Sequence, residues 1–141
     1  MQLVLGPDVF VNASVAPGSA PDRVVQRALS RATVKVHATG WLLERVEAML
    51  RALPEFRDEA VAAQMKLIVG YLEVIEDPTE HPAEAWEPAL SAAAKSAGAT
   101  RVVTDHPDLL ASDSSEVEFI STEAWLLEQA LPPPPPSVPS E

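Results

Sequence analysis

Residues 3–12 read LVLGPDVFVN, and residues 101–110 read RVVTDHPDLL. In each stretch, an apolar run typical of a buried strand is followed by a turn-forming sequence that carries acidic residues. Such strands alternate with helical segments along the chain, which favours an α/β fold with a parallel sheet covered on both faces. Ligands of these folds bind beyond the carboxyl ends of strands, at the point where the strand order reverses. We therefore expect both stretches to lie at such a place.

Hydrophobic spacing and capping residues predict the other elements. Phe10 and Val11 continue an apolar segment into a loop that Pro17 and Gly18 close. Residues 72–75 fit either a strand or the end of the preceding helix, in which Val69 is expected to face inward. Thr39 is the expected N-terminal cap of the helix that it begins, and Gly98 and Ser121 are the expected caps of the last two helices. The expected strands are residues 2–5, 33–37, 100–104 and 117–120, and helices are expected from residue 21, from 39 to 53, from 58, and over 88–97 and 122–130.

Length and composition fit a single globular domain. The chain has 141 residues, of which 47% are hydrophobic, and it contains no cysteine. This excludes disulfides and zinc–thiolate sites and fits a reducing cytoplasm. No apolar stretch reaches the roughly 20 residues of a membrane span, so we expect no membrane contact. We predict one cytoplasmic domain over residues 1–130 and a disordered, proline-rich tail over 131–141.

The chain has a net charge of −11, which opposes binding to RNA, because RNA affinity depends on cations that neutralise phosphates. Its basic residues nevertheless concentrate in the first half of the sequence. They are either solvated helix positions or a local basic face. The early group consists of Arg23, Arg27, Arg31, Lys35, Arg45, Arg51 and Arg57.

The series of motifs resembles the PIN-domain family, in the branch described as putative toxin components of toxin–antitoxin pairs. In that branch the first strand is followed by Asp-Thr-Asn-Val, which residues 6–9 match as Gly-Pro-Asp-Val. The fourth strand ends in Val-Thr-Gly-Asp-Lys-Asp-Leu-Leu, matched by residues 103–110 as Val-Thr-Asp-His-Pro-Asp-Leu-Leu. The resemblance runs over about residues 2–130. It implies a three-layer α/β/α fold with a central, mainly parallel sheet.

The resemblance also implies where a metal site would lie. PIN nucleases hold Mg²⁺ or Mn²⁺ between three or four carboxylates and cleave RNA, since hard cations prefer oxygen ligands and activate water. The four matched positions in this chain are Gly6, Arg45, Pro88 and His106. Acids stand beside three of them, at Glu44, Glu87 and Asp105. A shift of one residue turns a side chain by about 100° on a helix and reverses its face on a strand. We therefore expect no catalytic residue, no metal and no other cofactor.

A rearranged site remains an alternative. Its acids would be Asp8, Glu87, Asp105 and Asp108, with Asp8 and Asp105 as ligands of Mg²⁺ or Mn²⁺. The same residues can equally cap helices and turns. His106 is either a general base or a loop histidine that faces water. Trp41, Trp86 and Trp125 are expected to be packing residues.

Three functional hypotheses follow. The leading one is a PIN-fold protein that has lost metal-dependent ribonuclease activity and acts as a binding or structural module, as a homodimer or with a small antitoxin-like protein. The second is an active Mg²⁺- or Mn²⁺-dependent endoribonuclease toxin with a displaced acidic site. The third is an adaptor that binds partners through the proline run at residues 132–136.

Overall fold

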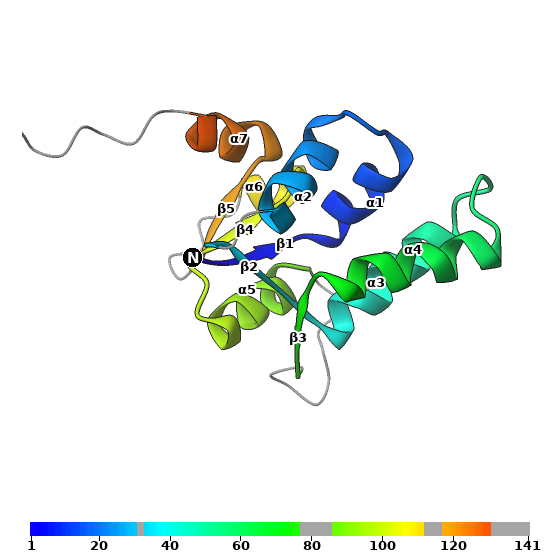
Figure 1. Cartoon of the computed structure of the whole chain (residues 1–141). Coiled ribbons are helices and arrows are strands. Elements are labelled where there is room, and N and C mark those ends of the chain that lie inside the picture. Colours follow the sequence, from blue (N-terminus) through cyan, green and yellow to red (C-terminus); the bar gives the residue numbers. More distant parts are fainter. Residues whose placement is uncertain (31–32, 77–85, 112–116, 131–141) are drawn as a thin grey trace, which may run out of the picture.

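Five parallel strands form the centre of the molecule, in the order β3-β2-β1-β4-β5. The computed structural model describes residues 1–30, 33–76, 86–111 and 117–130 (Figure 1). The parallel pairing of all five strands confirms the expected α/β fold with a central parallel sheet. The strands are β1 (Gln2–Leu5), β2 (Lys35–Thr39), β3 (Glu73–Ile75), β4 (Arg101–Val103) and β5 (Glu118–Ile120).

The central strand β1 is buried on both faces. Leu3, Val4 and Leu5 are fully buried, although successive side chains of a strand point to opposite faces. Leu3 is paired with Val36 of β2, and Val4 is paired with Val102 of β4. This explains why the sequence of β1 is a continuous apolar run and not an alternating one.

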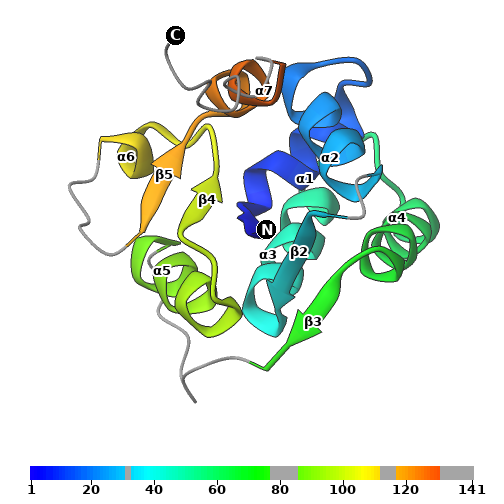
Figure 2. The same cartoon turned by 60° about the vertical axis from the view of Figure 1, so that its left-hand side comes forward.

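Helices cover both faces of the sheet (Figures 1 and 2). Helix α5 lies on one side, against β1, β2 and β4. Helices α1, α2 and α7 lie on the other side, where α2 contacts both α1 and α7, and α3 packs against α1 and α4. The helices are α1 (Pro7–Val15), α2 (Ala20–Ser30), α3 (Gly40–Arg51), α4 (Asp58–Gly70), α5 (Trp86–Ala97), α6 (Pro107–Leu110) and α7 (Thr122–Ala130).

The expected capping residues are confirmed. The Thr39 hydroxyl accepts a hydrogen bond from the backbone N–H of Leu42 at the start of α3. The Ser121 hydroxyl accepts one from the backbone N–H of Ala124 at the start of α7. Gly98 ends α5 with a φ of +72°, in the left-handed region that glycine adopts without strain.

Two short helices were not expected from the sequence. Residues 7–15 form α1 where a loop was predicted, and residues 107–110 form α6. Every residue from Pro7 to Val11 is buried, so no polar face marks α1 as an amphipathic helix. Proline in the first helical turn, followed by an acid, is a start signal that both helices share.

Some boundaries also differ from the prediction. Strand β2 occupies residues 35–39 and not 33–37, and residues 73–75 form a strand and not a helix end. Val69 is 40% exposed, so the expectation that it faces inward was wrong. Helix α4 ends at Gly70, and its buried residues are Val61 and Ile68. Val69 therefore lies beside the inward stripe and not on it.

Several expectations lie outside the described residues. Composition predicts a loop at residues 77–82 and a serine-rich turn at 112–115, and both fall outside the described residues, as does the proline-rich tail predicted at 131–141. Within the described ranges, no helix is both long enough and apolar enough to span a membrane.

Leu90 tests the packing of α5 on the sheet. It is fully buried, so Leu90→Ala should lower the free energy of unfolding by about 2–5 kcal/mol through lost burial and the cavity left behind. The matched control is Leu67→Ala on α4, where the side chain is 56% exposed and the expected change is within about 0.5 kcal/mol. Urea denaturation measures both. Equal losses in the two variants would contradict this packing.

Candidate functional site

The carboxyl ends of β1 and β4 meet at the point where the strand order reverses. From β1 the chain moves to β2 and β3 on one side of the sheet, and then to β4 and β5 on the other. This is the crevice in which open parallel α/β sheets bind ligands. Helix α1 starts two residues after β1 ends, and residues 104–106 leave β4 beside it. The backbone N–H of Gly6 donates to the carbonyl of Val103 at 2.8 Å and holds the two strand ends together.

Asp8 bridges these two segments with its carboxylate. It lies in the first turn of α1 and is only 9% exposed. The hydroxyl of Thr104 donates to Asp8 Oδ1 at 2.8 Å, and the backbone N–H of Asp105 donates to Asp8 Oδ2 at 2.8 Å. Both carboxylate oxygens are therefore engaged with the loop that follows β4.

The Asp8 carboxylate also fills the space beside Gly6. A Cβ atom at position 6 would lie 2.5 Å from Asp8 Oδ1 and 3.2 Å from the Cβ and hydroxyl oxygen of Thr104. Any side chain at position 6 would thus exclude Asp8 from its observed position. An acid does stand beside the end of β1, but it is supplied from helix α1 and not from the strand end itself.

The side chain of Asp105 contacts helix α7. Its Oδ1 accepts from the backbone N–H of Thr122 at 2.9 Å, and its Oδ2 accepts from the Thr122 hydroxyl at 2.7 Å. A carboxylate in this position satisfies a free N–H of the first helical turn and interacts favourably with the helix dipole. The Asp105 side chain therefore has a clear structural role at the start of α7.

The protein environment changes the acidity of Asp8. Burial is the largest effect and raises the pKa of Asp8 above its ordinary value of 3.8. The hydrogen bonds from the Asp105 N–H and the Thr104 hydroxyl act in the opposite direction, and the nearby charge of Asp105 raises the pKa further. Ionised Asp8 is thus stabilised by hydrogen bonds but destabilised by its loss of water.

His106 has a local structural role. The His106 Nδ1 accepts from the backbone N–H of Asp108 at 3.2 Å, and the backbone N–H of His106 donates to the Thr104 hydroxyl at 3.1 Å. The imidazole ring lies against the indole of Trp86, with ring centroids 5.0 Å apart. His106 is therefore a half-buried cap of α6, which differs from the expected histidine that faces water. Its role as a general base stays a prediction.

The remaining acids of the rearranged site are more exposed. Glu87, in the first turn of α5, and Asp108, in α6, both face solvent. Glu44 is exposed on α3, and the guanidinium of Arg45 lies 5.7 Å from the centre of the Trp41 ring. Within the described part of the chain, no group of three or more His, Asp or Glu residues could hold a metal ion. As arranged, these residues do not fit the carboxylate cluster that a divalent cation requires.

The structure brings Asp8 and Asp105 together, and it adds two residues that the sequence did not single out. Thr104 was part of the quoted motif but had no assigned role. Thr122 was hidden by the more obvious cap at Ser121. Thr104 directly follows β4, Thr122 is the first residue of α7, and both are buried. A hydroxyl at such a position needs a hydrogen-bond partner, which is the signal that could have identified them.

The close approach of Gly6 and Asp8 predicts coupled mutations. Gly6→Ala should lower the free energy of unfolding by about 1–3 kcal/mol, because the displaced Asp8 carboxylate loses its buried donors. In an Asp8→Ala background the same change should cost less. Gly70→Ala is the control, because nothing lies within 4 Å of an added Cβ there. Additive effects of Gly6→Ala and Asp8→Ala in urea denaturation would contradict the contact.

The raised pKa of Asp8 predicts a pH dependence of stability. Between the ordinary value of 3.8 and the raised pKa, the folded state binds more protons at Asp8 than the unfolded state does. The contribution of Asp8 to the free energy of unfolding is therefore largest at low pH and falls as pH rises through this window. The stability of the wild type minus that of Asp8→Asn, measured from pH 4 to pH 7, should decline. A difference that grows with pH would contradict the effect of burial.

Comparisons with known proteins place the fold. No protein-family model and no curated protein matches the sequence. A chain in the crystal structure of VapBC2 from Rickettsia felis, bound to a DNA fragment from their promoter, matches with a TM-score of 0.65 at 10% identity. That match covers 86% of this chain and 98% of the other. PAE2754 from Pyrobaculum aerophilum matches with a TM-score of 0.57 at 18% identity, covering 92% of this chain and 88% of the other.

At these identities the similarity concerns the fold alone. It extends over most of each chain, and it agrees with the five-stranded parallel sheet in the order 3-2-1-4-5. The resemblance noted in the sequence is confirmed at this level: the chain has the PIN fold.

Proposed function

We propose that this protein is a PIN-fold binding module that has lost metal-dependent ribonuclease activity. The single observation that carries the proposal is the state of its two central acids. Asp8 is held by Thr104 and the Asp105 N–H, and Asp105 is held by Thr122. The acids that lie nearest to the expected metal position thus have structural partners.

The energetics support this proposal. A metal site would need the Asp105 carboxylate to turn away from α7, and losing a helix-capping interaction costs about 0.5–2 kcal/mol. The other candidate acids, Glu87 and Asp108, are exposed and form no cluster with Asp8 in the described structure. Metal-dependent cleavage would therefore require rearrangement of a hydrogen-bonded network before the metal could bind.

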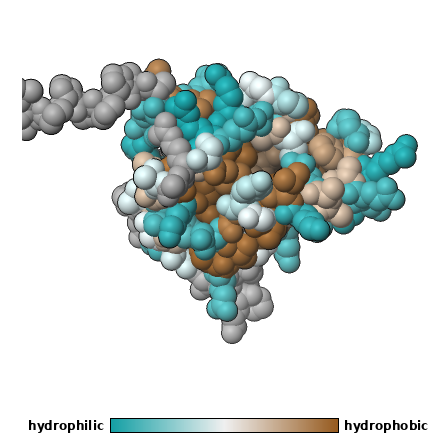
Figure 3. All heavy atoms as spheres, in the orientation of Figure 1, coloured by the Kyte–Doolittle hydropathy of each residue, from teal (hydrophilic) through white to brown (hydrophobic). Residues whose placement is uncertain are grey.

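The surface supports a role in protein binding. Leu67, Tyr71 and Val74 are 56%, 63% and 53% exposed at the end of α4 and on the edge strand β3. A cavity of about 520 Å³ lies beside them, lined in part by Lys66 and Gly70. Apolar residues also gather over the centre of the face in Figure 3. Exposed apolar surface of this kind is typical of protein–protein contacts, whereas the net charge of −11 opposes RNA binding.

Two kinds of partner fit this role. One is a small antitoxin-like protein, which the fold similarity to a chain of the VapBC2 structure favours. The other is a second copy of the chain, which could use the edge strand β3. Light scattering of the purified protein separates a homodimer from a monomer that needs a different partner.

A second candidate function is kept open by one observation. The Asp8 carboxylate lies beside Gly6, at the strand end where the family has its first acid. An endoribonuclease with a displaced site would use Asp8 and Asp105 as ligands of Mg²⁺ or Mn²⁺. It would act as a toxin of the kind that the sequence resemblance implies.

A ribonuclease assay tests the proposal. The full chain should not cleave single-stranded or structured RNA in Mg²⁺ or Mn²⁺ faster than an Asp8→Asn/Asp105→Asn preparation does. That double variant controls for contaminating nucleases, and circular dichroism shows whether it is folded. Metal-dependent cleavage by the wild type that is lost in a folded Asp8→Asn variant would overturn the proposal and favour the endoribonuclease.

A further inference from the structure

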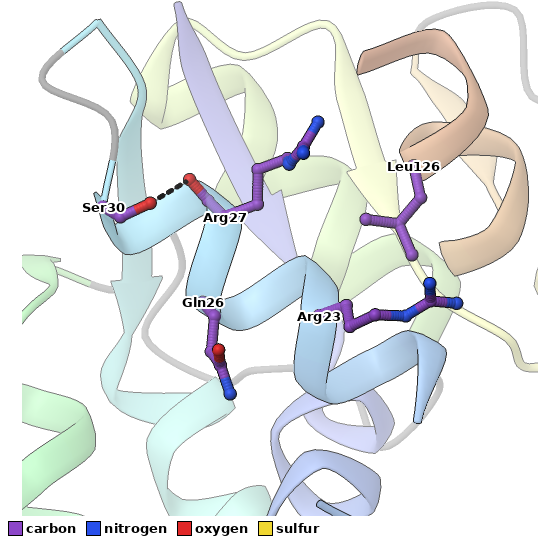
Figure 4. A pocket seen from close by; sticks show the side chains of 5 residues that line it. All are labelled: Arg23, Gln26, Arg27, Ser30 and Leu126. Carbon is purple, nitrogen blue, oxygen red and sulfur yellow. Dashed lines mark hydrogen bonds between the residues drawn. The ribbon is translucent and has the colours of Figure 1, made fainter. Parts of the chain in front are cut away.

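A basic groove lies between helices α2 and α7, away from the carboxyl ends of β1 and β4. Its volume is about 450 Å³, and its lining residues are Arg23, Gln26, Arg27, Ser30 and Leu126 (Figure 4). This volume lies within the range of about 300–1,000 Å³ that is usual for ligand sites. The groove is open, as a surface that receives another chain must be.

The two arginines of the groove have no carboxylate partner among the described residues. Among the described residues, the arginines that form ion pairs with acids are Arg51 and Arg101, and neither lines the groove. Glu128 of α7 is bound by Arg101, at 2.9 Å, and Asp22 accepts from the Gly18 N–H and from Gln26 Nε2. Glu128 and Asp22 thus have other partners, and Glu123, one turn before Leu126 on α7, forms no ion pair with either arginine in the described part of the chain.

Arg23 and Arg27 present these cations together. They are four residues apart on α2, so they lie on one face about 6 Å apart along the helix. Both side chains extend from α2 toward α7, and Leu126 lies between the two guanidinium groups in Figure 4. Each guanidinium carries five N–H donors in a planar fork that suits a carboxylate.

The other polar residues of the groove are already engaged. The Ser30 hydroxyl donates to the carbonyl of Arg27 at 3.1 Å, and the Gln26 amide donates to Asp22 at 3.0 Å. The groove therefore offers two cationic forks and one apolar contact at Leu126.

From this combination we propose that the groove binds an acidic amphipathic helix of a partner protein. On such a helix, acidic residues at i and i+4 have the spacing of Arg23 and Arg27, and an apolar residue at i+3 lies on the same face to contact Leu126. A single phosphate would leave the apolar wall unused, and a longer polynucleotide would be repelled by the net charge. The inference rests on the proposed binding function, to which it adds a surface and the chemistry of the partner.

A peptide titration tests the groove. The probe is a labelled alanine-based peptide of about 16 residues, long enough to form a helix in part, with glutamates at i and i+4 and leucine at i+3. Fluorescence anisotropy with the full chain at low salt should show binding about tenfold tighter than for the same peptide with glutamines. Equal affinity for the two peptides, or no binding of either, would overturn the proposal.

Charge-reversal variants locate the binding. Arg23→Glu/Arg27→Glu should weaken binding of the glutamate peptide by about tenfold or more. Arg57→Glu/Lys95→Glu makes the same change in net charge on exposed residues at the start of α4 and on α5, and it should change affinity less than about twofold. An equal loss in both double variants would mean that only overall charge matters, which would overturn the groove.

Two further measurements distinguish a loss of peptide binding from unfolding of the variant and from binding of RNA. If the double reversal unfolds the protein, Arg27→Gln serves instead and should weaken binding without a change in circular dichroism. An RNA oligonucleotide that competes for the groove better than the glutamate peptide would overturn the choice of partner. The ribonuclease assay is independent: cleavage would overturn the proposed loss of activity, whereas absent peptide binding would overturn the groove alone.

Discussion

The carboxylate of Asp8 holds the carboxyl edge of the sheet together. It joins the first turn of α1 to Thr104 and to the backbone of Asp105, at the place where the strand order reverses. Asp105 in turn holds the first residue of α7. One continuous set of hydrogen bonds therefore connects α1, the end of β4 and α7. The absence of a side chain at Gly6 is what allows Asp8 to take this position.

This network supports the proposed loss of metal-dependent cleavage. Carboxylates grouped at the centre of a PIN fold repel one another unless a cation neutralises them. Here N–H and hydroxyl donors bind both acids and offset part of the cost of their burial and mutual repulsion. The cations and the apolar residues that remain available lie elsewhere, on α2 and α7 and at the end of α4. Under the proposed function, the binding surface would therefore be separate from the Asp8–Asp105 site.

Much of the fold could be predicted from the sequence, because its determinants are local. The apolar run of β1, the Thr39 cap and the positive φ of Gly98 each depend on neighbouring residues only. Helix α1 could not be recognised in this way, since burial on all sides removes the amphipathic pattern. The sequence also placed Gly6 where the family that it resembles has its first acid, and it offered Asp8 as a nearby alternative; that assignment stays a prediction. It could not show that Asp8 turns over Gly6 while Asp105 turns toward α7, because those directions depend on Thr104 and Thr122, which lie far away in the chain.

The most direct test of this account is the affinity of the carboxyl edge for Mn²⁺. Electron paramagnetic resonance measures free Mn²⁺, and its signal falls when the ion binds to protein. The account predicts that wild-type protein and an Asp8→Asn/Asp105→Asn variant lower this signal equally, through weak surface binding alone. One tightly bound Mn²⁺ per wild-type chain, lost in the folded variant, would contradict it and would show that Asp8 and Asp105 still form a metal site.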